Sequence, residues 1–167
     1  NPGKKLVVDS SCSATQYSTG EYSLPEVVGL DQEGRVSETI LEAAKKAGLR
    51  TGLISDTRIT HATPASYASH NIKRTNENEI AQEMITVGPD IMLSGGLRHF
   101  IPKTETPELK KLLPSRLGYK SKRKDELNLL DFAKKTGYEL VFNKDSLKNS
   151  NSKKVLGLFT NSAMPHG

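Results

Sequence analysis

Apolar residues along the chain form two kinds of run, and each kind predicts a different element of secondary structure. Short and nearly continuous apolar runs are typical of buried strands, and they lie at 4–10, 51–56, 89–96, 138–142 and 153–159. Segments with helical apolar spacing, or with helix start and stop signals, lie at 36–47, 64–74, 77–88 and 125–137. Strands and helices therefore alternate through most of the sequence.

Three of the helical segments are followed at once by a glycine and then by a strand-like run. The glycines are Gly48, Gly88 and Gly137, and each stands where a left-handed residue commonly ends a helix. This order is typical of parallel sheets whose strands are connected by helices. We therefore predict an α/β fold with a mostly parallel sheet flanked by helices on both faces. In such sheets ligands gather beyond the carboxyl ends of the strands.

Two polar stretches interrupt this alternation. Residues 102–124 combine a dense run of lysines and arginines with prolines, and we expect a surface excursion there. Residues 144–154 are rich in asparagine, serine and lysine, and they predict a polar loop. The length of 167 residues suits one compact domain that includes both stretches.

Composition narrows the classes of protein without choosing one of them. The net charge of +5 favours anionic partners such as phosphate esters or nucleic acid. The single cysteine, Cys12, excludes an internal disulfide and a cysteine-based metal site within the chain. We expect no membrane span, because no run approaches the roughly 18 apolar residues that one needs, and no signal peptide is visible.

The first candidate for chemistry is the pair Asp9 and Ser10, which ends the first strand-like run. Small residues that can begin a helix follow, so the pattern places Ser10 at a helix N-terminus. Backbone N–H groups and the positive end of the helix dipole favour a bound phosphate there. A serine nucleophile also needs a base or a metal. The alternative is that Ser10 and Ser11 only cap the helix.

A second cluster of polar side chains lies at 55–74, after one predicted strand and before a predicted helix. His61 and Thr63 alternate as they would on an extended loop, so we expect them to face similar directions and to suit a metal site. The planar guanidinium of Arg74 suits two oxygens of a phosphate. Taken singly, each of these residues also fits an ordinary turn or a solvated surface.

Together the two stretches resemble the alkaline phosphatase family. The segments that carry the resemblance are "DSSCSAT" at 9–15 and "THATPASYASH" at 60–70, followed by "KR" at 73–74. Three further stretches support it in the same order, at 33–55, 90–100 and 153–165. The sequence departs from the family pattern at Ser11, where alanine is usual, and at Ser94, where glycine is usual. The resemblance implies that 1–167 is part of a phosphatase catalytic domain with a three-layer sandwich fold.

The resemblance implies hydrolysis of phosphate monoesters through a phosphoserine, with two zinc ions and one magnesium ion as cofactors. Ser10 would be the nucleophile and a zinc ligand. Asp9 would orient Arg74, which would hold two phosphate oxygens. Thr63 would supply its hydroxyl to the magnesium site. His61 would adjust that site through a water molecule, because imidazole is a poor ligand for a hard cation.

The ligand set that these metals need is incomplete in the sequence. There are four histidines, and none forms a pair of the D-x-x-x-H kind. The family pattern implies that the missing ligands lie before and after these residues. We therefore expect an internal segment of a longer enzyme, with little or no phosphatase activity on its own. The resemblance further implies a periplasmic or secreted enzyme that can form a homodimer.

Two other functions stay open at this point. A metal-dependent phosphodiesterase of the same superfold would need a similar nucleophile, whereas the sulfatase pattern fails because neither Pro nor Arg follows Cys12 at the required spacing. A basic module that binds nucleic acid through 103–124 is the second alternative. We do not expect nucleic-acid binding, because Trp is absent and Tyr119 is the only aromatic residue within the run.

Overall fold

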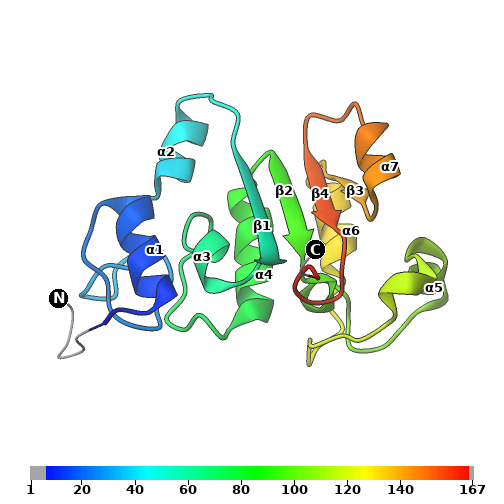
Figure 1. Ribbon diagram of the computed structural model, residues 1–167, viewed down its shortest axis with the longest axis horizontal. Helices are drawn as coiled ribbons and strands as arrows, with labels where there is room; N and C mark the ends of the chain where they lie inside the picture. The colour runs from blue at the N-terminus through cyan, green and yellow to red at the C-terminus, as the bar shows by residue number, and fades with distance from the viewer. Residues whose placement is uncertain (1–6, 166–167) are drawn as a thin grey trace. The chain divides into compact units, whose positions relative to one another are not determined.

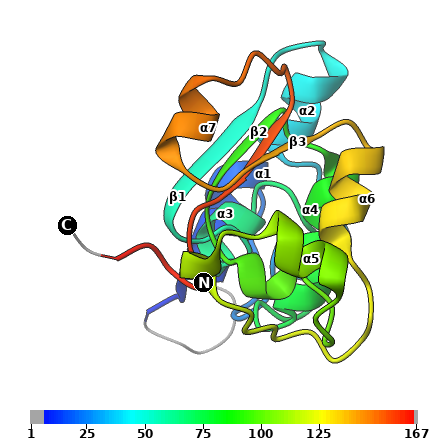
Figure 2. The ribbon, with the colours of Figure 1, turned by 90° about the vertical axis from the view of Figure 1, so that its right-hand side faces the viewer.

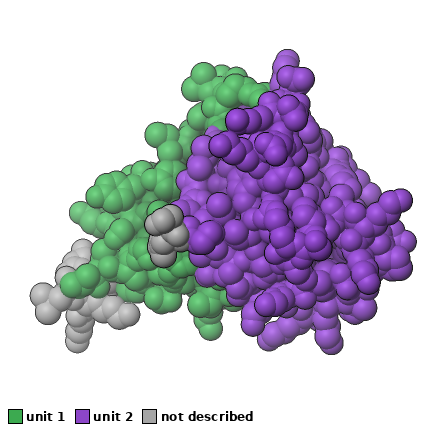
Figure 3. Space-filling model, turned by 45° about the vertical axis from the view of Figure 1, so that its right-hand side comes forward, with its two compact units in different colours: residues 1–51, 60–89 green, residues 52–59, 90–167 purple. Residues whose placement is uncertain are grey.

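The computed structural model describes residues 7–165 and divides into two compact units. The residues up to Thr51 and Thr60–Pro89 form unit 1, and Gly52–Ile59 and the residues from Asp90 onward form unit 2. Figure 3 shows the two units in green and purple. Among the residues described, no helix has both the length and the apolar character that crossing a membrane requires.

Unit 2 contains a four-stranded sheet in the order β1-β2-β4-β3. The strands are β1 (Gly52–Arg58), β2 (Ile91–Gly95), β3 (Glu139–Val141) and β4 (Val155–Leu158). All three neighbouring pairs are parallel, so the predicted α/β fold is confirmed. The central strands are the most buried, and every residue of β4 is buried. This explains why the sequence at 153–159 reads as an uninterrupted apolar run.

The helices of unit 2 follow β2 and β3 along the chain (Figure 1). They are α5 (Pro107–Leu112), α6 (Leu129–Lys135) and α7 (Lys144–Lys148), with 3-10 turns η1 (Leu97–His99) and η2 (Ser115–Leu117). Leu129, Leu130 and Ala133 of α6 are buried, and α6 packs beside β3 (Figure 2). α5 and η2 lie within 102–124.

The polar loop predicted at 144–154 is wrong in its first half, where the chain forms α7. Asn143 and Ser146 form a capping box, since the Asn143 side chain accepts from the Ser146 amide at 2.7 Å. A capping box can start a helix that has no apolar face, and no residue of α7 is buried. Apolar periodicity therefore gave no sign of it.

Unit 1 contains α1 (Ser10–Thr19), α2 (Ile40–Lys46), α3 (Ala62–Ala65) and α4 (Glu77–Val87). α1 packs against α3 (Figure 1). The buried hydroxyls of α1 face Ser66, with Thr15 Oγ1 at 3.2 Å from Ser66 Oγ and Ser18 Oγ donating to Ser66 O at 2.6 Å. The small polar residues after Ser10 thus form a closely packed, hydrogen-bonded helix contact.

The helix predictions in unit 1 differ in their outcome. The helix at 77–88 is confirmed as α4, and Gly88 follows it with φ of 72°. The helix predicted at 36–47 is shorter, because a capping box between Thr39 and Glu42 starts α2 only at Ile40.

The helix predicted at 64–74 is wrong, because α3 ends at Ala65. The amide groups that a longer helix would use have other partners. His70 N donates to Glu83 Oε2 at 3.1 Å, and Asn71 N donates to Val28 O at 2.8 Å. Local turn hydrogen bonds continue as far as Ala68, and tertiary hydrogen bonds replace the helical ones at His70 and Asn71.

The strand predicted at 4–10 lies partly outside the described residues, which begin at 7. Residues 7–9 are not in a strand, and Ser10 already belongs to α1. The helix that the sequence predicts after Asp9 is therefore confirmed.

Candidate functional site

Asp9 caps α1 and leaves the Ser10 hydroxyl exposed. Asp9 Oδ1 accepts from Ser11 N at 2.9 Å, from Cys12 N at 3.0 Å and from Ser11 Oγ. Ser11 is fully buried, whereas Ser10 is exposed. The alternative that Ser10 and Ser11 cap the helix is therefore wrong, because the carboxylate of Asp9 does so.

The Asp9 cap also changes what the helix N-terminus offers to a phosphate. The amide groups of Ser11 and Cys12 already donate to the carboxylate. Partial burial alone would raise the pKa of the Asp9 carboxyl, but the hydrogen bonds that it accepts from neighbouring amides and one hydroxyl lower it. The carboxylate is therefore ionised near neutral pH, and it occupies the amide groups of Ser11 and Cys12.

The guanidinium of Arg74 joins Ser10 to His61. Arg74 Nη1 donates to Ser10 Oγ at 2.9 Å, and Arg74 Nη2 lies 3.4 Å from His61 Nε2. All three residues belong to unit 1, although they come from the start of α1, the turn before α3 and the segment before α4. Ser10, the predicted nucleophile, and Arg74, the residue predicted to bind phosphate, thus lie side by side.

Asp9 is connected with Arg74 through the backbone of Glu26. Glu26 N donates to Asp9 Oδ2 at 2.7 Å, and Arg74 N donates to Glu26 O at 2.7 Å. The sequence did not single out Glu26 as a candidate site residue. The one local signal is Pro25, because proline often precedes a left-handed residue in a tight turn.

His61 and Thr63 lie at the beginning of α3 and not on an extended loop. His61 is the N-cap residue, and its carbonyl accepts from Ala65 N at 3.0 Å. Thr63 lies inside the helix and is exposed, while His61 is half-buried. The extended conformation expected for this pair holds for His61, which has φ of −67° and ψ of 155°, but is wrong for Thr63, which lies within the helical turn.

The metal donors in the described residues do not fit a complete zinc or magnesium site. Within 7–165 there is no group of three or more His, Cys, Asp or Glu side chains that could hold a metal ion. A catalytic zinc usually needs three protein ligands. Ser10, Thr63 and His61 can therefore provide individual ligands at most.

The glycine pair at the end of β2 serves packing in unit 2. A Cβ at Gly95 would lie 1.9 Å from Ser162 O, so no larger residue fits there. The preceding Ser94 donates to Thr57 O at 2.7 Å, which accommodates a hydroxyl where the family usually has glycine. Serine at position 94, where the family pattern usually has glycine, therefore fits this fold.

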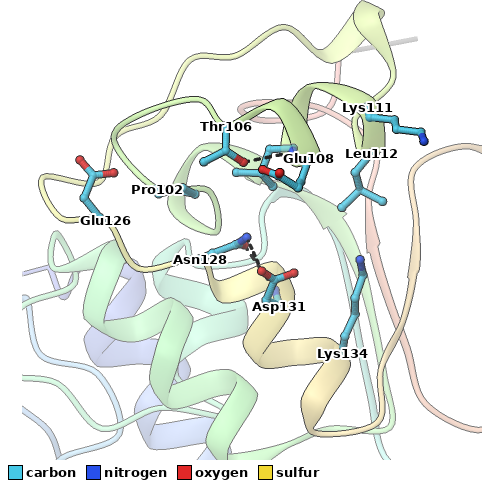
Figure 4. A pocket seen from close by; sticks show the side chains of 10 residues that line it. Pro102, Thr106, Glu108, Lys111, Leu112, Glu126, Asn128, Asp131 and Lys134 are labelled. Carbon is cyan, nitrogen blue, oxygen red and sulfur yellow. Dashed lines mark hydrogen bonds between the residues drawn. The ribbon is translucent and has the colours of Figure 1, made fainter.

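A pocket in unit 2 lies between α5 and α6 (Figure 4). It has a volume of about 760 Å³, and two of its polar side chains, Thr106 and Asn128, cap these helices. Thr106 accepts from Leu109 N at 3.3 Å, and Asn128 Nδ2 donates to Asp131 Oδ2 at 2.8 Å. None of the predicted site residues lines this pocket.

The model of the alkaline phosphatase family matches residues 1–167, and the chain belongs to this family. It is 37% identical to the repressible alkaline phosphatase of Saccharomyces cerevisiae, over 96% of this chain and 29% of that protein. It is 38% identical to alkaline phosphatase 3 of Bacillus subtilis, over 95% of this chain and 31% of that protein. The chain thus spans about three tenths of the length of these curated relatives.

Solved structures of alkaline phosphatases share the fold. The enzyme from the Antarctic bacterium TAB5 superimposes with a TM-score of 0.82 at 26% identity, over 99% of this chain and 43% of that one. The Thermus thermophilus enzyme gives a TM-score of 0.80 at 30% identity, over 95% of this chain and 30% of that one. Two TAB5 variants, in which one histidine is replaced by Asp or Glu, contain magnesium in the site called M3.

Proposed function

We propose that these residues supply the nucleophile and the phosphate clamp of an alkaline phosphatase that hydrolyses phosphate monoesters. The observation that carries the proposal is the hydrogen bond from Arg74 Nη1 to the exposed Ser10 hydroxyl. A serine held at a helix N-terminus beside a guanidinium is suited to attack a phosphorus atom whose oxygens the guanidinium binds. Membership in the family supports the same conclusion.

In the proposed reaction, Arg74 binds two oxygens of the phosphate and places the phosphorus in front of Ser10 Oγ. The Oγ–P bond forms as the bond from phosphorus to the leaving alcohol oxygen breaks, which gives a phosphoserine. A water molecule then attacks this intermediate, and Ser10 is released with inorganic phosphate. The positive guanidinium balances charge on the non-reacting oxygens in both steps.

We propose that zinc and magnesium are the cofactors of the complete site. Ser10 would provide an oxygen to zinc, Thr63 an oxygen to magnesium, and His61 would act on the magnesium site through water. Such ions stabilise negative charge and activate hydroxyl groups. Since the described residues include no group of three His, Cys, Asp or Glu side chains that could hold a metal ion, most ligands would come from other parts of the protein.

The family resemblance also supports two proposals about the full-length protein. We propose that it acts in the periplasm or as a secreted enzyme, and that it can assemble as a homodimer. Its substrates would be phosphate monoesters. Nucleic acid is not among the partners that we propose.

The test replaces the nucleophile in the full-length protein that carries this segment. Ser10→Ala should abolish turnover of p-nitrophenyl phosphate and the phosphoenzyme that is trapped at low pH. Ser13→Ala, in the same helix, is the matched control and should retain both. Retained turnover in Ser10→Ala would show that the nucleophile is wrong, and a preference for bis(p-nitrophenyl) phosphate would favour a phosphodiesterase.

A second measurement tests the incomplete metal site. The isolated 167-residue chain should show little or no turnover of p-nitrophenyl phosphate, even with added zinc and magnesium. Robust turnover that a chelator abolishes would overturn the proposal that other parts of the protein complete the site.

A further inference from the structure

The turn at Pro25 and Glu26 has an unusual backbone conformation. Glu26 has φ of 66°, and it is the only residue other than glycine with a positive φ within 7–165. In a turn that begins with proline, a left-handed second residue is usually glycine or asparagine. A residue with a longer side chain keeps such a conformation where surrounding interactions hold it.

Hydrogen bonds hold Glu26 on both sides of its backbone. Its N–H donates to Asp9 Oδ2 at 2.7 Å, and its carbonyl accepts from Arg74 N at 2.7 Å. Two residues further on, Val28 and Asn71 exchange backbone hydrogen bonds of 2.9 and 2.8 Å. The segment from Glu26 to Val28 is thus fastened both to the cap of α1 and to the segment that leads to Arg74.

These contacts close a ring around the candidate site. The ring runs from Ser10 to its neighbour Asp9, through the backbone of Glu26 to the backbone of Arg74, and through the guanidinium back to Ser10 Oγ. Arg74 is therefore anchored at its amide by Glu26, while its guanidinium is directed at the nucleophile. The side chain of Glu26 is exposed, so the backbone makes the connection.

We propose that Glu26 is a positioning residue for the phosphate clamp. Its left-handed backbone sets the spacing between the carboxylate of Asp9 and the backbone of Arg74, and so places the guanidinium on the phosphate that Ser10 receives. This inference rests on the proposed function, because phosphate is the ligand that the guanidinium would bind. Small displacements of a positioning group are costly, since binding and catalysis both depend on its geometry.

The experiment compares Glu26→Val with Glu26→Gly in the full-length protein. Valine is β-branched and resists a positive φ, whereas glycine adopts it freely and keeps both backbone hydrogen bonds. We expect Glu26→Val to raise KM for p-nitrophenyl phosphate and the inhibition constant of inorganic phosphate about tenfold. Glu26→Gly should leave both constants close to those of the parent protein, because glycine keeps the left-handed backbone. Glu21→Val, an exposed glutamate in the same region, controls for the lost charge and added apolar surface.

Combining Glu26→Val with Arg74→Ala separates a positioning role of Glu26 from general destabilisation of the protein. If Glu26 acts through Arg74, Glu26→Val should change the inhibition constant of phosphate little once Arg74→Ala is present. An equal loss with and without Arg74 would overturn the inference, as would unchanged phosphate inhibition in Glu26→Val.

Hydrogen exchange of the ligand-free protein distinguishes this inference from the proposed function. The Arg74 amide should be less protected in Glu26→Val than in Glu26→Gly, whatever reaction the protein catalyses. Equal protection in the two variants would overturn the positioning role. The expected difference in protection, found in a protein that neither binds nor hydrolyses phosphate compounds, would overturn the proposed function instead.

Discussion

Arg74 Nη1 donates a hydrogen bond of 2.9 Å to Ser10 Oγ, although the two residues are 64 positions apart. Because both residues lie in unit 1, the proposed phosphate clamp lies within one compact part of the chain.

Replacing Arg74 by lysine should weaken phosphate binding even though the positive charge is kept. Lysine offers a single ammonium group, whereas the guanidinium donates two parallel hydrogen bonds to two oxygens. In the full-length protein we expect the inhibition constant of inorganic phosphate to rise about tenfold or more. Arg35→Lys, on an exposed loop with Asp31 and Glu33, is the control and should leave this constant unchanged. An Arg74→Lys variant with parental phosphate inhibition would contradict the clamp.

Removing the Asp9 carboxylate should destabilise α1. Asp9→Ala leaves the amide groups of Ser11 and Cys12 without their partner, and loss of such a cap costs about 1 kcal/mol. Urea denaturation of the chain at pH 7 measures the change in the free energy of unfolding. Asp145→Ala, in the first turn of α7 but not its cap, should cost less.

The same carboxylate should make stability depend on pH in the acid range. Because the pKa of Asp9 is lower in the folded state, its contribution is fully present above its unfolded pKa of about 4. The contribution is lost as the pH falls through the folded value. The difference in unfolding free energy between the parent and Asp9→Ala should therefore shrink below about pH 4. A difference that is constant down to pH 2 would show that ionisation of Asp9 plays no part.

Gly29 should tolerate no side chain. It has φ of 63°, and a Cβ there would lie 2.1 Å from Ser69 O and 2.7 Å from His70 Nδ1. Gly29→Ala should lower the free energy of unfolding by about 3 kcal/mol, because the backbone must move. Gly34→Ala is the matched control, since it has φ of 78° with open space around it, and it should cost only about 1 kcal/mol. Equal effects in urea denaturation would contradict the steric explanation.

Arg123 should be the most sensitive residue of the basic run. Its side chain is 2% exposed, and it donates to both oxygens of Asp125, at 2.7 and 2.8 Å, and to His99 O at 3.0 Å. Arg123→Lys cannot make all of these bonds and should cost about 2 kcal/mol of unfolding free energy. Lys124→Ala, at the exposed next position, should change it by less than about 0.5 kcal/mol.

Local patterns predicted the parts of the fold that depend on neighbouring residues. The apolar run that became β4 and the helical spacing of α4 were both visible, because a fully buried strand gives a continuous apolar run and one buried helix face gives a helical period. The start of α2 depended on a capping box, and α7 had no apolar face at all. Polar side chains start both helices. Apolar periodicity therefore placed the start of α2 too early and missed α7.

The candidate site shows the same division. The resemblance of two short stretches to the alkaline phosphatase family singled out Ser10 and Arg74, and the structure brings them together. The left-handed backbone of Glu26 was not predicted, because glutamate rarely adopts it and nothing in the neighbouring sequence requires it. The extended loop expected at His61 and Thr63 ends at His61, because α3 begins at the next residue.

The sequence by itself determined the α/β order of helices and strands, the residue types available for phosphate chemistry and the family. These properties are encoded in short patterns of burial and in motifs a few residues long. Only the tertiary structure decided that the helix predicted at 64–74 gives way after Ala65 to hydrogen bonds with Val28 and Glu83, and that Glu26 joins Asp9 to Arg74. Each of these depends on which backbone groups meet across long separations, and no local pattern specifies that pairing.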